Sequence, residues 1–278
     1  MRMAYARFVV LIVLCLFGGR ELHAQFWQKC TLPSAYANGY FLDVFFLPSN
    51  PQYGWVCGQQ GFVLRTSDGG ASWQGTVVPY QGRSGGHLES IHFVSQQIGY
   101  CSGPCGVFAS TDGGASWSDI SPTMPGSQSP WGLFFLNASW GVVVGGGCGG
   151  TQGFALTTNG GSTWSYSTGN LPASGMTDAL LYSNGRGFAV GSGQLWRTLD
   201  SGRTWSPFQS GFASIWNEEI SQSGASFLLP WAGTQCAGGG GGGGGRFSTD
   251  SGATWTTYST GQPMYGSFLL NSTTGWIC

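Results

Sequence analysis

Thr66-Ser-Asp-Gly-Gly-Ala-Ser-Trp73 is the stretch that decides the fold, because four further copies of it follow along the chain. The copies close on tryptophans that are 44, 47, 41 and 50 residues apart: Trp73, Trp117, Trp164, Trp205 and Trp255. The third residue of each copy is an aspartate or an asparagine: Asp68, Asp112, Asn159, Asp200 and Asp250. A fixed period of this length indicates that one supersecondary unit is stacked repeatedly.

Each phrase has the composition of a tight turn between two strands. The oxygen of its third side chain can accept hydrogen bonds from N–H groups just ahead, and glycine adopts positive φ at little cost. Short apolar runs flank the first copy, at residues 61–65 and 76–78, so the turn joins antiparallel strands. The closing tryptophan buries a large ring against its neighbours. Since five near-identical copies cannot all be active sites, we interpret these residues as structural.

A second hairpin is predicted upstream of each phrase. In the first unit it comprises residues 43–47 and 54–58, separated by a polar break. Three later units repeat the pair at residues 90–94 and 99–101, 132–136 and 141–144, and 178–182 and 187–190. Four short strands in about 45 residues is the size of one β-propeller blade. The sequence therefore predicts an all-β propeller built from four-stranded blades.

The phrases resemble the Asp-box, or bacterial neuraminidase repeat, whose pattern is Ser/Thr-x-Asp-x-Gly-x-Thr/Ser-Trp. This repeat occurs in sialidases, xyloglucan-cleaving endoglucanases, sortilin-type receptors and the photosystem II stability/assembly factor family. Residues 43–73 are most similar to the last family, because they contain Asp-Val-x-Phe, Gly-Trp-x-x-Gly-x-x-Gly and Arg-Thr-x-Asp-Gly-Gly-x-x-Trp in that order. The resemblance covers roughly residues 26–278 and implies a sialidase-superfamily propeller. It does not determine the activity, because unrelated activities share the repeat.

Residues 1–24 have the features of a secretory signal peptide. Arg2 and Arg7 form a basic start, residues 8–17 are an apolar run, and residues 22–24 suit a cleavage site. We therefore expect residues 25–278 to be exported to the periplasm, the cell surface or the medium. The apolar run is too short for a retained anchor, so no membrane span is expected in the mature chain.

Five phrases and a further pair of apolar segments, residues 267–270 and 275–278, predict five blades and part of a sixth. Trp27 lies 46 residues before Trp73, in register with the phrases, so residues 28–32 are expected to form the outer strand of a blade shared by both ends. One strand and one turn are then missing for a six-bladed ring, and about 45 residues for a seven-bladed one. We interpret the chain as truncated at its C-terminus.

Composition narrows the function classes. Only 8% of the 278 residues are charged and the formal net charge is −1, which argues against electrostatic binding to nucleic acid or to an anionic membrane. Seven cysteines follow residue 24, and an exported chain permits disulfides. Cys101 and Cys105 are the best candidates for a disulfide, since they would bridge the two arms of one hairpin. The Cα separation that such a bond requires cannot be checked in a sequence.

No cofactor, metal site or catalytic residue is predicted. His87-Leu-Glu89 with Pro104-Cys105 partly matches a zinc-deaminase pattern, but position 108, where its second cysteine would fall, is Phe. A sialidase-like site requires several converging arginines, an acidic pair and a tyrosine nucleophile. Here Arg65 and Arg197 directly precede phrases, and this repeated placement is typical of residues on a strand face.

The candidate binding residues lie where the innermost strands begin, at the expected rim of the central channel. Asp43 and Asp178 occupy equivalent positions in their units, and Trp131 and Trp216 lie nearby in the repeat alignment. The tryptophans can stack on sugars or on apolar side chains. The alternative interpretation is that the two aspartates cap their own strands with hydrogen bonds.

The leading hypothesis is an exported, non-enzymatic propeller that binds or scaffolds a protein partner, as the resemblance to photosystem II assembly-factor repeats implies. A carbohydrate-active propeller is the first alternative, either a glycosidase or a glycan-binding module. A sortilin-like peptide receptor is the second. Substitution of Asp43 and Asp178 separates the leading hypothesis from the first alternative, because only a glycan site requires those carboxylates.

Overall fold

The computed structural model describes residues 30–80, 86–123, 129–146, 153–167, 175–233 and 241–278. The predicted signal peptide and Trp27 lie outside these residues. A short 3₁₀ helix, Ser34–Tyr36, precedes the first strand, and every other regular element in the described ranges is a β-strand. No helix in those ranges is long and apolar enough to cross a membrane.

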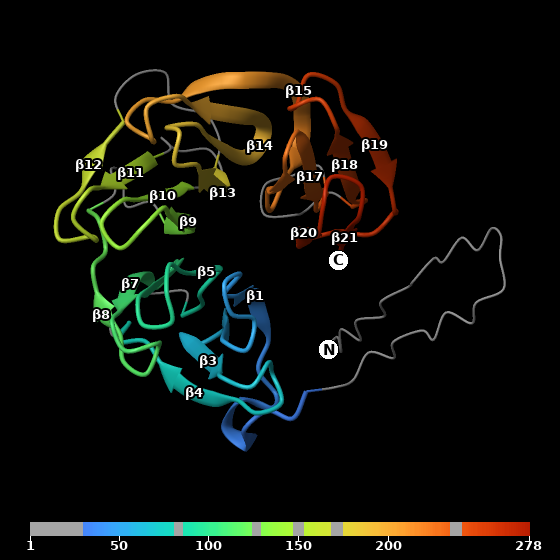
Figure 1. The fold of residues 1–278 in the computed structure, drawn as a ribbon. Helices are drawn as coiled ribbons and strands as arrows, with labels where there is room; N and C mark the ends of the chain where they lie inside the picture. Colours follow the sequence, from blue (N-terminus) through green and yellow to red (C-terminus); the bar gives the residue numbers. More distant parts are fainter. Residues whose placement is uncertain (1–29, 81–85, 124–128, 147–152, 168–174, 234–240) are drawn as a thin grey trace, which may run out of the picture.

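The strands form six antiparallel sheets that follow one another around a common centre (Figure 1). Blade 1 contains β1 (Phe41–Phe46), β2 (Gly54–Gly58), β3 (Phe62–Thr66) and β4 (Gln74–Val77). Blade 2 contains β5 (Ser90–Phe93), β6 (Gly99–Gly103), β7 (Gly106–Ser110) and β8 (Ser118–Asp119). Blade 3 contains β9 (Ser129–Phe135), β10 (Gly141–Gly146), β11 (Gly153–Thr157) and β12 (Ser165–Tyr166).

The second half of the ring repeats this plan. Blade 4 contains β13 (Met176–Leu181), β14 (Gly187–Thr198) and β15 (Ser206–Trp216). Blade 5 contains β16 (Ser221–Ser223), β17 (Ser226–Trp231), β18 (Gly244–Ser248) and β19 (Thr256–Ser259). A partial blade follows, in which the described residues form β20 (Ser267–Leu269) and β21 (Gly275–Ile277). The predicted β-propeller architecture is therefore confirmed, with five blades and a two-stranded sheet after them.

Consecutive strands are neighbours in every sheet, so each blade is a meander. In Figure 1 the strands β1, β5, β9 and β13 lie nearest the centre, and β4, β8, β12 and β19 lie at the rim. The start of each innermost strand therefore borders the central channel. This placement brings the predicted candidate residues to one region of the molecule.

Blade 4 reaches the four-stranded plan with one long strand. β14 folds back on itself at Gly193, whose φ of +77° suits a residue without a side chain. Its two ends meet, because a Cβ added to Gly187 would lie 2.9 Å from Cγ2 of Thr198. β14 therefore supplies both the second and the third strand of the blade, and its curved ribbon is visible in Figure 1.

The hydrophobic core lies between adjacent blades. Trp55 of blade 1 stacks on Phe93 of blade 2 with ring centroids 3.6 Å apart and planes 6° apart. Tyr100 of blade 2 stacks on Phe135 of blade 3 in the same way, at 3.4 Å and 3°. Because the core residues of one blade pack against those of its neighbour, a blade has no core of its own.

The repeated phrases form the turns between the third and fourth strands. In the first copy, Asp68 accepts hydrogen bonds from the Thr66 hydroxyl at 2.7 Å and from the N–H of Ser72 at 2.9 Å. The Thr66 hydroxyl oxygen in turn accepts the N–H of Gly70 at 2.9 Å. Asn159 makes the matching contacts in the third copy, so the turn requires the oxygen and not the charge. Gly69 and Gly70 both have positive φ, as predicted for this turn.

Candidate functional site at the central channel

Asp43 and Asp178 each join the innermost strands of two adjacent blades. Asp43 Oδ2 accepts a 2.7 Å hydrogen bond from the N–H of Ile91 in β5, and its Oδ1 accepts the N–H of the following residue. Asp178 repeats this arrangement in β13, where Oδ2 accepts the N–H of Ile220 at 3.0 Å. Each carboxylate therefore stabilises a junction between blades and caps the start of its own strand.

Other side chains perform the same task at other junctions. Glu219 Oε2 accepts the N–H of Ser267 at 2.6 Å, which ties blade 5 to the partial blade. His92 Nδ1 accepts the N–H of Phe135 at 3.2 Å, which ties blade 2 to blade 3. Burial lowers the pKa of His92 to about 4, so its ring is neutral at physiological pH and has a nitrogen free to accept. Side chains that accept an N–H from the next blade therefore recur at several junctions of this ring.

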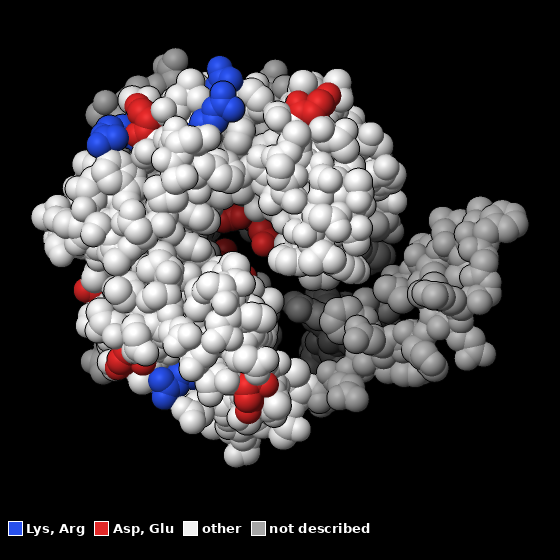
Figure 2. All heavy atoms as spheres, in the orientation of Figure 1, with Lys and Arg blue, Asp and Glu red and all other residues white. Residues whose placement is uncertain are grey.

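The carboxyl groups in the channel hold protons more tightly than ordinary acids. Burial raises the pKa of Asp43 to about 6, although two backbone hydrogen bonds lower it in part. Burial also raises the pKa of Asp178 to about 7, and the charge of Asp43 adds to the effect. For Glu218 burial and the charge of Glu89 raise the pKa to about 8. Figure 2 shows Asp and Glu atoms gathered in the central opening, where neighbouring negative charges raise one another's pKa.

Trp131 and Trp216 meet at the same place in the ring. Their ring centroids are 5.4 Å apart with the planes at 73°, an edge-to-face contact. Both rings lie against Gly175, where an added Cβ would come within 2.6 Å of Trp131 and 3.1 Å of Trp216. Trp216 is buried and its indole bonds to Glu218, whereas Trp131 is half-buried. Trp131 is therefore the aromatic ring of the pair that can contact a ligand.

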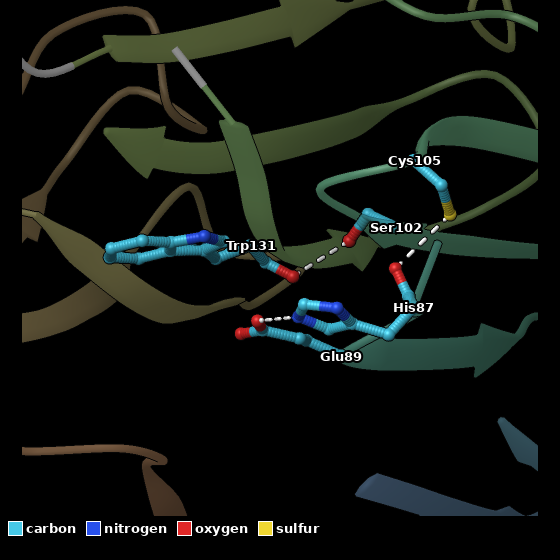
Figure 3. A network of polar contacts seen from close by, with 5 residues as sticks. All are labelled: His87, Glu89, Ser102, Cys105 and Trp131. Atoms are coloured by element: carbon cyan, nitrogen blue, oxygen red, sulfur yellow. Dashed lines mark hydrogen bonds and ion pairs between the residues drawn. The ribbon is translucent and has the colours of Figure 1, made fainter. Parts of the chain in front are cut away.

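A polar network borders Trp131 (Figure 3). Nε2 of His87 and Oε1 of Glu89 are 2.8 Å apart, and Ser102 Oγ donates to the carbonyl oxygen of Trp131 at 2.9 Å. The Cys105 thiol donates to the backbone carbonyl of His87 at 3.1 Å. Cysteine, histidine and glutamate side chains are thus close together beside Trp131. Within the described residues no cluster of His, Cys, Asp and Glu is suited to hold a metal ion.

Cys101 and Cys105, for which a disulfide was predicted, lie in one hairpin, and the disulfide stays a prediction. Cys101 pairs with Phe108, and Gly103 pairs with Gly106, so Cys105 lies in the turn and not on the strand opposite Cys101. Cys101 is a free, buried thiol, and burial raises its pKa. Both cysteines pack in the core between blades 1 and 2.

The structure brings together more groups than the sequence reasoning selected. Asp43 and Asp178 interact electrostatically across the channel, and Trp131 contacts Trp216. The residues missed were Glu218, Glu219 and Glu89. Glu219 precedes an apolar residue, Ile220, just as Asp43 precedes Val44, so an alignment of the fifth blade with the first contained the signal.

A second concave region lies away from the channel, between the phrase turns of blades 1 and 2. It is lined mainly by polar side chains, among them Tyr53, Gln96 and Asp112. Arg65 lies in it and donates to Gln74 Oε1 at 2.9 Å. This groove is open and shallow, and none of the four candidate binding residues from the sequence lies in it.

Comparisons with known proteins support the same fold. The model of the family "photosynthesis system II assembly factor YCF48" matches residues 20–137. The solved structure of YCF48 from Cyanidioschyzon merolae is 19% identical with a TM-score of 0.57, and the match covers 90% of this chain and 95% of that one. The structure of YCF48 bound to D1 peptide is 18% identical with a TM-score of 0.54, covering 86% and 88%. No curated protein sequence matches the chain.

Glycoside hydrolase propellers are also similar in fold. The crystal structure of an ancestral GH74 enzyme has a TM-score of 0.67 at 15% identity, and the match covers 83% of this chain. This chain spans only 33% of the length of that enzyme. The bacterial-neuraminidase-repeat propeller fold and the similarity to the YCF48 family, both expected from the sequence, are confirmed.

Proposed function

We propose that the chain is an exported, non-enzymatic β-propeller that binds a protein partner and acts as an assembly scaffold. The match to the YCF48 family model supports this proposal, as does the near-complete mutual coverage with YCF48 structures. One of those structures is YCF48 bound to D1 peptide, which supports a polypeptide as the ligand class. Photosynthesis is not part of the proposal.

The observation that carries the non-enzymatic part is the use of the channel carboxylates. Asp43, Asp178 and Glu219 each accept a backbone N–H of the next blade. Paired-acid hydrolysis requires one carboxyl group free to protonate a leaving group and a second free to attack or to activate water. Carboxylates committed to blade junctions are not available for those steps.

The half-buried ring of Trp131 supplies the contact surface of the proposed site. An aromatic ring at the centre of a contact is typical of residues that contribute most to protein binding. Glu89 and His87, side chains that are 33% and 27% exposed, border it with polar groups. A partner segment with an apolar residue for Trp131 and a basic or amide group for Glu89 fits these features.

A pull-down with the mature chain tests the proposal. The bait is residues 25–278, and the prey is a crosslinked envelope extract of the source organism. Trp131→Ala is expected to reduce the recovered partner about tenfold, the effect of losing roughly 1.4 kcal/mol of binding. Tyr258→Ala is the matched control, because Tyr258 is an exposed aromatic residue on β19, at the rim. Recovery of no partner, or equal loss in both variants, contradicts the proposal.

Export has its own test. We expect N-terminal sequencing of the protein isolated from its native host to begin at Gln25. A mature protein that retains residues 1–24 contradicts the exported location. That result would not contradict the binding proposal, which the pull-down tests separately.

One observation favours a carbohydrate-active protein as the second candidate. The pKa of Glu218 is raised to about 8, which keeps a proton on it at neutral pH as a general acid requires, and the charge of Glu89 is among the causes. A soluble polysaccharide panel, xyloglucan included, distinguishes the two candidates. Release of reducing ends that Glu218→Gln abolishes supports this candidate, whereas no release removes it.

A further inference from the structure

A small groove lies at the junction of blades 4 and 5, beside the phrase turns of both. It has a volume of about 100 Å³, and its lining includes Arg186, Phe188, Arg197, Leu199, Phe208 and Ser251. We call it the blade 4–5 groove. It is the counterpart of the groove between blades 1 and 2, because Arg65 and Arg197 both directly precede a phrase and each lines one of the two grooves. None of the residues named for the channel site is among those that line it.

Strand geometry brings the two arginines to one side of blade 4. The two ends of β14 lie against each other, so Phe188 near its start faces Arg197 near its end. Arg186 lies two residues before Phe188 and therefore points to the same side. The Cζ atom of Arg197 is 5.0 Å from the centre of the Phe208 ring. A guanidinium over an aromatic face keeps N–H groups free at its edge.

Two of the lining residues differ in character from their equivalents in the other blades. Arg186 precedes the second strand of its blade, where the other blades have uncharged residues: Tyr53, Ile98, Trp140 and Ala225. Leu199 is the second residue of its phrase, where the other phrases have a serine or a threonine, and it is 63% exposed. Because four other blades fold without these side chains, packing of the ring does not require them.

Neither arginine of the blade 4–5 groove has a carboxylate partner within the described residues. No ion pair of Arg186 or Arg197 is present among those residues, and no Asp or Glu lines the groove. In the groove between blades 1 and 2, by contrast, Arg65 donates to Gln74, and Asp112 is part of the lining. Figure 2 shows Arg atoms over blade 4, at the top of the view, with no Asp or Glu atoms against them. Two guanidinium groups in one groove without a counter-charge favour an anion there.

We propose that the blade 4–5 groove binds a small organic acid, a carboxylate attached to an apolar group. The forked N–H groups of arginine match the two oxygens of a carboxylate, and Ser251 adds a hydroxyl donor. The apolar group packs on Leu199 and on the half-buried ring of Phe208, which a bare inorganic anion would leave exposed to water. The volume of the groove suits a ligand of this size and excludes a folded segment of a protein.

Saturation-transfer NMR of residues 25–278 with sodium phenylpropionate tests the proposal. Binding is expected in the low millimolar range, because both arginines are exposed to water. Arg186→Gln and Arg197→Gln are each expected to raise the dissociation constant about fivefold, since each removes charge-assisted hydrogen bonds. Leu199→Ser is expected to raise it about twofold through the lost apolar contact. Circular dichroism of every variant checks that the fold is retained.

Two controls make the result specific to this groove and to the anion. Arg65→Gln alters the equivalent arginine of blade 1 and should leave the dissociation constant unchanged. Phenylpropionamide has the same ring without the charge and should bind about tenfold more weakly. A loss in Arg65→Gln equal to that in Arg186→Gln overturns the proposal, because it would show attraction by net charge alone.

Other results would overturn it as well. They are the absence of phenylpropionate binding at high millimolar concentration, and binding of the amide as tight as that of the acid. Inorganic phosphate that displaces phenylpropionate at equal concentration would assign the groove to inorganic anions and contradict the proposed ligand class. Since Trp131→Ala should retain phenylpropionate binding while it loses the protein partner in the pull-down, the two sites are tested independently.

Discussion

Asp68 and Asp43 belong to the same blade, and their pKa values are shifted in opposite directions. Asp68 lies in the exposed phrase turn, where hydrogen bonds from Ser72 and Thr66 lower its pKa to about 2. Asp43 accepts two backbone N–H groups at the channel, yet burial raises its pKa to about 6. Hydrogen bonds of similar kind therefore accompany a lowered pKa for Asp68 at the exposed phrase turn and a raised pKa for Asp43 at the central channel. The difference shows that desolvation, and not the number of hydrogen bonds, decides the charge of an aspartate in this ring.

The largest effect is expected from removing a channel acceptor. Asp43→Ala leaves the buried N–H groups of Ile91 and Val44 without their acceptor, which costs about 2–4 kcal/mol of unfolding free energy. Asp43→Asn keeps an acceptor oxygen and serves as the control, with a loss of about 1 kcal/mol at pH 5. Urea denaturation measures both variants. Equal and small losses would mean that Asp43 does not hold blades 1 and 2 together.

The pH dependence of stability sharpens the same contrast. Because the pKa of Asp43 is raised in the folded protein, the folded state binds more protons than the unfolded chain between about pH 4 and pH 6, so stability falls as pH rises through this window. Asp178 extends the fall to about pH 7. Asp43→Asn is expected to remove the fall of about 1.4 kcal/mol that this carboxyl group gives the wild type between pH 5 and pH 8, so the variant should be close to wild type in stability by pH 8. Thermal melts from pH 4 to pH 8 measure the curve, and a variant whose curve parallels wild type would contradict the assignment.

The sequence predicted what depends on neighbours along the chain. Residues 54–58 were expected as a strand and are β2, and the expected turn at Asp68 is present with its glycines at positive φ. The junction between Asp43 and Ile91 could not be predicted in this way, because it joins residues 48 positions apart through the packing of two blades. The raised pKa of Asp178 could not be predicted for the same reason, because it depends on burial of the carboxyl group in the folded ring. The position of Cys105 depends on the register between β6 and β7, in which Gly103 pairs with Gly106, and composition does not determine that register.

A smaller effect is expected at the phrase turns, where the oxygen matters and the charge does not. Asp112 accepts hydrogen bonds from Ser110 and Ser116 at 2.6–2.9 Å, so Asp112→Ala is expected to cost about 1 kcal/mol. Asp112→Asn should be nearly neutral at pH 7, since Asn159 builds the same turn in blade 3. Urea denaturation of the two variants checks the difference. If Asn proved as costly as Ala, the charge would be essential at the rim and the contrast with the channel would weaken.

The smallest effect concerns the backbone of the turns and not their carboxylates. Ser201 and Ser251 occupy the position of Gly69 and have φ of 61° and 59°, a left-handed conformation that side chains disfavour. Ser201→Gly removes this strain but gives the unfolded chain more freedom, so the net gain should be only about 0.5 kcal/mol. Gly69→Ser is the reciprocal change and should cost a similar amount, because a Cβ there meets no atom closer than 3.4 Å. Thermal melts at pH 5 compare the two, and opposite shifts are expected. Shifts of the same sign would show that contacts of the serine hydroxyl, and not φ, determine the residue at this position.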